Sequence, residues 1–376
     1  MIPVNRPLIL DSDVHAVSNA LIATQISGTS DSVKQLEKKL QRLLTSNHFI
    51  STSSGTSAID CVVSALNLDS KDVAVVPSFS IISTINELMR RGVRLRMVDV
   101  SEDTFMPDND QYLRCIDSKV SIVIPTHIYG LLHDIETLKS ELTGTKVHIL
   151  EDAAEAFGAL HRDGSLAGTL GDSGVFSFYA NKNVTGGEGG GIATNDALLA
   201  TAAQEIRNLG FSNVGERFIH ERTGWNARLG GLAAALITSQ LDRVQSILQR
   251  KIAIGKRYRA NLNGHKALDF QLDRFNEVEN FYWVFAVKIS RSSSQTASDL
   301  KDYLNESGIE SRRFFFPLHL QPVVIKSGLL ISDYPMPNSE FLWQKGLYLP
   351  SGVGTTNQEI DYVCEKLWSW ESMAYT

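Results

Sequence analysis

The chain has few cysteines and no long hydrophobic run. Its three cysteines, Cys61, Cys115 and Cys364, form no CxxC or Cys/His pair, so we predict buried thiols and neither a disulfide framework nor a metal site. The longest apolar stretch, at residues 232–237, is far shorter than the roughly 20 residues that a membrane-spanning helix needs. The first residues lack the apolar core of a signal peptide. We therefore predict a soluble, cytoplasmic protein with no membrane partner.

The sequence also lacks an excess of basic charge. It has 36 lysines and arginines against 42 acidic residues, and the basic residues are scattered. A nucleic-acid-binding protein would gather basic residues on one face or stripe, so we predict no nucleic-acid partner. A phosphate on a small ligand can still be held by local backbone amides, which the net charge of −6 does not exclude.

Short apolar segments alternate with helical patterns in the first part of the chain. Strands are predicted at residues 73–76, 93–98, 120–125 and 147–150. This alternation is typical of an α/β fold with a mostly parallel sheet. In such sheets the ligand-binding groups gather at the carboxyl ends of strands, where this chain has Phe79, His127 and Asp152.

No Ser/Gly-rich linker or internal repeat divides the chain, but its pattern changes within one long predicted helix that runs from Leu232 past Tyr258. A smaller α+β unit is indicated by a strand at residues 282–287 and helices at 296–304 and 358–370. We predict a large domain at residues 14–245 and a small C-terminal domain at 246–376, joined by segment 1–13.

Residues 151–194 carry the pattern with the clearest chemistry. An apolar run ends in the carboxylates Glu151 and Asp152, and Lys182 follows a second predicted strand. This is the layout that a pyridoxal phosphate enzyme needs. The lysine forms a Schiff base with the aldehyde, and the acid keeps the pyridine nitrogen protonated. A solvated surface lysine and a helix-capping aspartate are the competing interpretations.

Two segments of small residues could bring the backbone close to a ligand. Residues 53–57, Ser-Ser-Gly-Thr-Ser, lie between a short strand and an apolar helix, where free amides could bind a phosphate. Residues 186–191 are rich in glycine but lack the strand-to-helix setting of a dinucleotide-binding loop. We predict that they form a loop behind Lys182 that permits a close backbone approach.

The sequence resembles a known family around these motifs. The Glu-Asp-Ala-Ala motif at 151–154, the Ser177 and Lys182 pair, and the Gly-Glu-Gly-Gly motif at 187–190 are similar to those of the DegT/DnrJ/EryC1/StrS sugar aminotransferases. The resemblance extends over residues 3–350. It implies a pyridoxal 5'-phosphate-dependent aminotransferase of fold type I, with a mostly parallel central sheet, a smaller C-terminal α+β domain, and a homodimer with shared active sites.

The most similar members transfer an amino group from L-glutamate to a GDP-linked 4-keto-6-deoxymannose, giving GDP-perosamine for surface polysaccharides. The resemblance implies that Lys182 is the catalytic Schiff-base lysine and that Asp152 pairs with the pyridine nitrogen. Many members have glutamine where this chain has Glu155, although the perosamine-forming members also have glutamate. Beside the ring oxygen, Glu155 must be protonated or paired with a base.

Cofactor-binding residues follow from the same resemblance. Gly55, Thr56 and Ser177 are implied at the phosphate, and Asn226 is implied to reach it from the partner subunit. Phe79 matches an aromatic residue that stacks on the cofactor ring. A turn residue for Asn226 and a core residue for Phe79 are the alternatives.

Substrate contacts are predicted at His127, Tyr129, Arg313 and His319. Arg312 and Arg313 could both meet the carboxylate of glutamate or the phosphates of a sugar nucleotide. Structural histidines and a solvated arginine pair are the competing interpretations.

Three other functions compete with this one. Some family members are dehydratases in which histidine replaces the lysine, and Lys182 argues against that chemistry. Motifs do not separate C4-keto from C3-keto sugars, GDP from UDP or dTDP carriers, or sugars from cyclitols. A cofactor-binding regulator without turnover is the alternative from a different class of protein.

Overall fold

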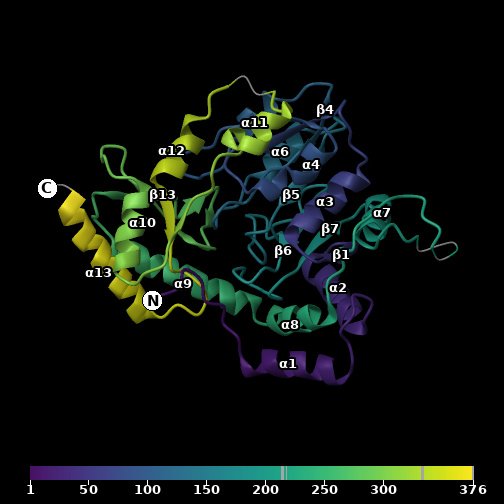
Figure 1. Cartoon of the computed structure of the whole chain (residues 1–376), viewed down its shortest axis with the longest axis horizontal. Coiled ribbons are helices and arrows are strands. Elements are labelled where there is room, and N and C mark those ends of the chain that lie inside the picture. The colour runs from purple at the N-terminus through teal and green to yellow at the C-terminus, as the bar shows by residue number, and fades with distance from the viewer. Residues whose placement is uncertain (213–215, 217, 332–333, 375–376) are drawn as a thin grey trace.

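A seven-stranded sheet forms the centre of the protein (Figure 1). The computed structural model describes residues 1–212, 216, 218–331 and 334–374. The strands are β1 (His48–Thr52), β2 (Val73–Pro77), β3 (Arg94–Val98), β4 (Val120–Val123), β5 (His148–Asp152), β6 (Ser173–Ser177) and β7 (Gly190–Thr194), in the order β1-β7-β6-β5-β4-β2-β3. Pairing is parallel from β3 to β6, whereas β7 is antiparallel to both β6 and β1. The prediction of a mostly parallel central sheet is confirmed.

Helices cover this sheet and bury its apolar strands. They are α2 (Asp31–Leu44), α3 (Gly55–Ala65), α4 (Asn86–Arg90), α5 (Asn109–Leu113), α6 (Ile135–Glu141), α7 (Ala197–Arg207) and α8 (Gly231–Leu241), with a short 3-10 helix η1 (Ile82–Thr84). The predicted amphipathic helix over residues 31–44 is confirmed, since Val33, Leu36 and Leu40 lie in the core. All residues of β2, β6 and β7 are buried, as expected for strands that are covered on both faces.

The long helix predicted from Leu232 past Tyr258 is two helices. The first, α8, ends at Leu241, and α9 (Val244–Asn261) begins after Arg243, whose φ of −119° and ψ of 15° lie outside the helical region. Arg243 instead donates to both carboxylate oxygens of the buried Asp13, at 2.9 and 2.5 Å. Helical periodicity continues across this break, so the sequence pattern did not reveal it.

The C-terminal part has a sheet of its own. Its strands are β8 (Leu268–Phe270), β11 (Phe285–Ile289), β12 (Arg312–Arg313) and β13 (Gly346–Leu349), in the antiparallel order β12-β13-β11-β8. Also in this part lie β9 (Arg274–Phe275), β10 (Val278–Glu279), α10 (Ala297–Glu306), η2 (Leu318–Leu320), α11 (Pro322–Ser327), α12 (Pro337–Lys345) and α13 (Asn357–Ala374). The strand predicted from residue 282 begins only at Phe285, because Tyr282 adopts a φ of +52°. This α+β unit agrees with the predicted one, and the predicted boundary at 245/246 falls inside α9.

The N-terminal segment lies against the C-terminal unit before it reaches α1 (Asp11–Ile22). Ile2 pairs with Ile309 in a parallel bridge, and the Arg6 guanidinium lies 2.8 Å from a Glu359 carboxylate oxygen. Figure 1 shows α1 beneath α8, apart from the central sheet. The segment thus contacts both units, while the domain limits stay a prediction. No helix within the described residues is both long and apolar enough to cross a membrane.

Candidate active site

A cavity of about 330 Å³ lies at the carboxyl ends of the parallel strands. Thr126, Asp152 and Ser177 reach it from the ends of β4, β5 and β6. The start of α3 lines a second wall. The C-terminal unit supplies a third wall, which includes Trp283 and Tyr348. Strand ends of an open α/β sheet are the usual place for a ligand, so this cavity is the candidate active site.

Lys182 lies in this cavity, in the turn between β6 and β7. Its side chain is only 12% exposed, and its Nζ is 4.0 Å from Oε1 of Glu155. The same nitrogen lies 3.9 Å from the centre of the Trp283 ring. Burial lowers the pKa of Lys182, although the charges of Glu155 and Asp152 oppose that shift. The amine is therefore closer to its neutral, nucleophilic form than a surface lysine would be.

Asp152 ends β5 and is buried beside the lysine. One carboxylate oxygen accepts from the Ala154 amide at 3.1 Å, and the other accepts from the Thr84 hydroxyl at a long 3.4 Å. Burial raises the pKa of Asp152, against the Ala154 hydrogen bond and the charge of Lys182. A buried carboxylate with such weak compensation fits a cationic N–H donor such as a protonated pyridine nitrogen.

Glu155 joins the lysine to a neighbouring loop. Its Oε2 accepts the backbone N–H of Tyr129 at 3.1 Å, while Oε1 faces Lys182. Burial raises the pKa of Glu155 to about 7, and the charge of Asp152 adds to the rise. Glu155 is therefore partly protonated near neutral pH, which meets the first of the two alternatives stated for it, and Lys182 is the base that faces it at 4.0 Å.

The first turn of α3 forms a wall on which a phosphate could bind. Ser54 caps the helix by accepting the Ser57 amide at 3.0 Å, and Gly55 and Thr56 line the cavity beside Ser177. A Cβ on Gly55 would lie 3.0 Å from the Cβ of Ser177, so glycine allows this close approach. Backbone amides and the helix dipole at an N-terminus favour an anion. These residues fit the phosphate of the predicted cofactor.

The predicted glycine-rich loop is partly a strand. Gly190 and Gly191 belong to β7, and a Cβ on Gly190 would overlap the backbone of Ser54 and Gly55. A Cβ on Gly191 would overlap the ring of Phe49. The close backbone approach is confirmed, and its partner is the start of α3.

Phe79 does not line the cavity. It is fully buried among Phe105, Phe314, Phe315 and Tyr129, with ring centres 5.7–6.2 Å apart. Phe79 thus has the position of a core residue, which was the alternative interpretation, and does not form part of the cavity wall.

Ile81, two residues after Phe79, lines the cavity instead. Tyr129, predicted at the substrate, is also fully buried. Its backbone N–H donates to Glu155, and its ring packs behind Trp283 and Tyr348, which line the cavity. The strand-end pattern located the correct edge of the sheet but not the residue that faces the cavity.

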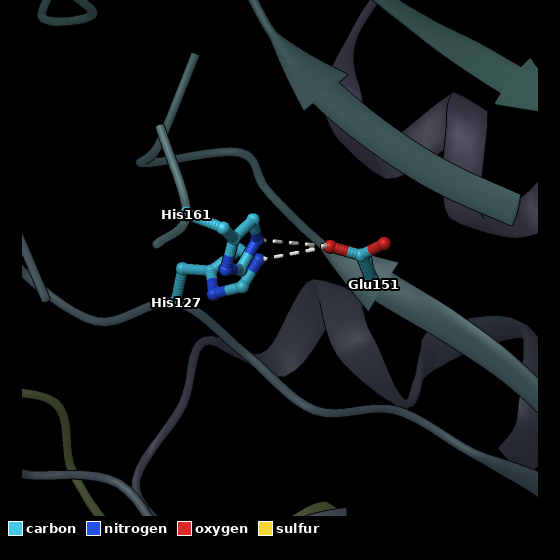
Figure 2. Close-up of side chains that lie close together, drawn as sticks. All are labelled: His127, Glu151 and His161. Carbon is cyan, nitrogen blue, oxygen red and sulfur yellow. Dashed lines mark hydrogen bonds and ion pairs between the residues drawn. The ribbon is translucent and has the colours of Figure 1, made fainter. Parts of the chain in front are cut away.

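His127 belongs to a cluster with Glu151 and His161, none of which lines the cavity (Figure 2). Its Nε2 lies 3.1 Å from Oε2 of Glu151, and Nε2 of His161 lies 4.0 Å from the same oxygen. The three groups have the spacing of metal ligands. However, Nδ1 of His127 accepts the backbone N–H of His133 at 2.9 Å, so the ring proton is on Nε2, which donates to Glu151 and has no lone pair for a metal. We assign a structural role to this cluster.

Arg313 and His319 contact protein groups outside the cavity. Arg313 donates to the Trp343 carbonyl at 2.8 Å, whereas its neighbour Arg312 lines the cavity. His319 bonds through Nδ1 to the Ser78 hydroxyl at 2.6 Å and through Nε2 to Glu340 at 3.3 Å. Consecutive residues of a strand point to opposite faces, so one of the two arginines had to point away from the site.

Trp283 and Tyr348 line the cavity without having been predicted, and Asn226 was predicted at the site but lies outside this cavity. Trp283 and Tyr348 were not predicted, because nothing in the sequence indicates that the small unit folds back onto Lys182. Asn226 is exposed, pairs with Asn208 in an isolated bridge, and does not line the cavity of its own chain. Its assignment to the partner's site stays a prediction.

The fold and a lysine that faces Glu155 in a cavity with Asp152 are those of a pyridoxal-phosphate-dependent aminotransferase, and the family match identifies a sugar aminotransferase. The chain belongs to the DegT/DnrJ/EryC1/StrS aminotransferase family, whose sequence pattern matches residues 8–368.

Similar proteins cover almost the whole chain. The GDP-perosamine synthase of Vibrio cholerae is 28% identical over 365 residues, 97% of each chain. The pleiotropic regulatory protein of Geobacillus stearothermophilus is 28% identical over 339 residues, 90% of this chain and 88% of its own. The crystal structure of the aminotransferase TlmJ from Streptoalloteichus hindustanus has the same fold, with a TM-score of 0.91 and 23% identity over 100% of both chains.

Proposed function

We propose that the protein transfers the amino group of L-glutamate to a nucleotide-linked 4-keto-6-deoxy sugar, with GDP-4-keto-6-deoxymannose as substrate and GDP-perosamine as product. The observation that carries the proposal is the Lys182 amine in a cavity with Asp152 and Glu155. The similarity to GDP-perosamine synthase supports the choice of sugar. A cytoplasmic homodimer that feeds surface-polysaccharide synthesis is part of the same proposal.

The residues of this chain would divide the work as follows. Pyridoxal phosphate, when bound, supplies an aldehyde and an electron-accepting ring. Lys182 would hold the aldehyde carbon and, once displaced by glutamate, would move the α-proton, which its lowered pKa favours. Asp152 would hold the proton on the pyridine nitrogen. Thr56, Ser177 and the amides at Gly55 would bind the phosphate.

The negative charges of the substrates would be bound at the rim of the cavity. Arg312 lines the cavity with a half-exposed side chain that donates a hydrogen bond to Tyr348 and lies 3.8 Å from a carboxylate oxygen of Glu310. A half-exposed guanidinium without a close carboxylate partner can bind the carboxylate of glutamate in one half-reaction and a diphosphate in the other. We assign the substrate role to Arg312 rather than to Arg313.

Lys182→Ala tests the catalytic assignment. The variant should lose at least about 10⁴-fold in turnover because, among the described residues, Lys182 is the one lysine that lines this cavity, and it should keep its fold and assembly. Borohydride reduction of the wild-type protein with pyridoxal phosphate, followed by peptide mass mapping, should place the adduct on Lys182. Wild-type turnover in the variant, or an adduct on another residue, would contradict the assignment of Lys182 as the catalytic lysine. Lys251→Ala, at a second buried lysine, is the matched control for adduct position.

A regulator without turnover is the second candidate, and the similarity to a pleiotropic regulatory protein favours it. Incubation with pyridoxal phosphate and L-glutamate separates the two functions. An aminotransferase releases 2-oxoglutarate in this half-reaction, whereas a regulator does not. Adding GDP-, dTDP- and UDP-linked keto sugars in turn then identifies the acceptor by the mass of the amino sugar.

A further inference from the structure

The Lys182 amine is held by an aromatic face as well as by a carboxylate. Its Nζ lies 3.9 Å from the Trp283 ring centre and 4.0 Å from Glu155. Neither distance is that of a hydrogen bond. The nitrogen therefore keeps its lone pair free after it loses a proton, while the indole face still attracts the protonated form.

Trp283 is itself fixed in place. Its side chain is 4% exposed, and Nε1–H donates to the carbonyl of Asn181 at 3.1 Å. Asn181 is the residue before Lys182, so one indole contacts both the amine and the backbone that carries it. The φ of +52° at Tyr282 and the bond from its N–H to Oδ1 of Asn280, at 2.7 Å, hold the turn that presents Trp283.

Trp283 also comes from the other unit of the chain. It lies between β10 and β11, whereas Lys182 lies between β6 and β7. A tryptophan needed only for packing would have no reason to place its N–H on the lysine turn and its face on the amine. The contact thus joins the small unit to the reacting group of the large one.

We propose that Trp283 is a positioning residue of this active site: its indole face keeps the Lys182 amine in the cavity, and its N–H fixes the turn that carries that amine. The proposal rests on the function proposed for Lys182, but the contact itself needs no cofactor. Its test can therefore be made without turnover.

The test is the pH dependence of Lys182 labelling by acetic anhydride in the cofactor-free full chain, followed by mass spectrometry. In Trp283→Leu the pKa of Lys182 should fall by about one unit, because the protonated amine loses the π-face. Trp283→Phe keeps a ring and should shift it by less. Trp343→Leu, which removes a ring that holds Arg313 outside the cavity, should titrate as wild type. An unchanged or raised pKa in folded Trp283→Leu would overturn the proposal.

A second measurement decides the question if Trp283→Leu does not fold. The tryptophan emission of the wild-type protein should change with the same midpoint as the labelling, and Lys182→Met should abolish that transition. Emission that is equal in the two proteins at every pH would refute the contact. Failure of the proposed function is a separate result: borohydride would then trap no cofactor on Lys182, while this titration would be unaffected.

Discussion

At the scale of single residues, the site depends on two groups that burial shifts toward their neutral forms, against the attraction between their charges. Glu155 and Lys182 are both buried, so each charge alone would be costly, and the 4.0 Å between them is too long for a tight ion pair. Burial shifts the glutamate pKa upward to about 7 and the lysine pKa downward. The two shifts bring the proton affinities of the groups closer together than those of a surface pair, which suits a lysine that must both give and take protons.

Glu155→Gln should change how stability depends on pH. Between about pH 4.5 and 7 the folded chain keeps a proton on Glu155 that the unfolded chain releases, so the free energy of unfolding falls as pH rises through this window. In cofactor-free Glu155→Gln that fall should shrink by up to about 3 kcal/mol. Urea unfolding at several pH values measures it, with surface Glu141→Gln as control. Parallel curves for wild type and Glu155→Gln would show that Glu155 is ionised in the folded chain.

The sequence was informative about this site where chemistry alone selects the residue. Lys182, Asp152, Thr56 and Ser177 line one cavity, as their motifs indicated. The positions of Phe79 and of the pair Arg312 and Arg313 were harder to predict. Adjacent residues at a strand end point in different directions, and only packing decides which one reaches the ligand. His127 is of a residue type that often binds ligands, but in the fold its ring is bonded to Glu151 and to the backbone of His133.

At the scale of elements, the phosphate wall depends on β7 passing close to the first turn of α3. Gly190 has no room for a side chain against Ser54 and Gly55. Since neither neighbour is a flexible side chain, an added methyl group must push the two elements apart. The glycines are therefore needed so that α3 can lie close to β7, as much as for the flexibility of the loop.

Gly190→Ala should destabilise the fold by about 1–3 kcal/mol and weaken the binding of pyridoxal phosphate, because α3 would be displaced. Urea unfolding and fluorescence titration with the cofactor measure the two effects. Gly230→Ala is the control, since its Cβ would lie 3.7 Å from the nearest atom, the Ile26 carbonyl, and the cost should stay below about 1 kcal/mol. Equal stability of the two variants would contradict the steric argument.

The ends of helices and strands were predicted well where the periodicity of hydrophobic residues determines them. They were predicted poorly where a tertiary contact determines them. The amphipathic α2 was found over its full length. The break between α8 and α9 was missed, since it depends on Arg243 reaching Asp13, some 230 residues earlier. The antiparallel β7 was missed because two of its five residues are glycines, which seldom indicate a strand.

At the scale of the whole molecule, both units of the chain line the cavity, and a residue of a partner subunit would be a third contributor. The small unit supplies Trp283 and Tyr348, and the exposed Asn226 lies outside the cavity of its own chain. A homodimer in which Asn226 serves the partner's cavity would account for that exposure.

Mixed dimers test the sharing of sites. Lys182→Ala and Asn226→Ala should each be nearly inactive, but unfolding and refolding them together should restore about a quarter of wild-type activity. Half of the dimers would be mixed, and one of the two sites in each would be intact. If Asn226 acted within its own chain, every site would carry one defect and no activity would return. Refolding either variant alone is the control.

The pairing of the N-terminal segment with the C-terminal unit sets an order of events during synthesis. Val4 donates its amide to Glu310, 306 residues later, and Arg6 binds Glu359, 353 residues later. A ribosome adds roughly 5–20 residues per second, so this segment waits tens of seconds for its partners. The central sheet is complete in sequence by Thr194 and can collapse first. The segment before α1 is thus among the last parts of the chain to dock, and a chain stalled before Glu310 would carry a folded central sheet while this segment still lacked its C-terminal partners.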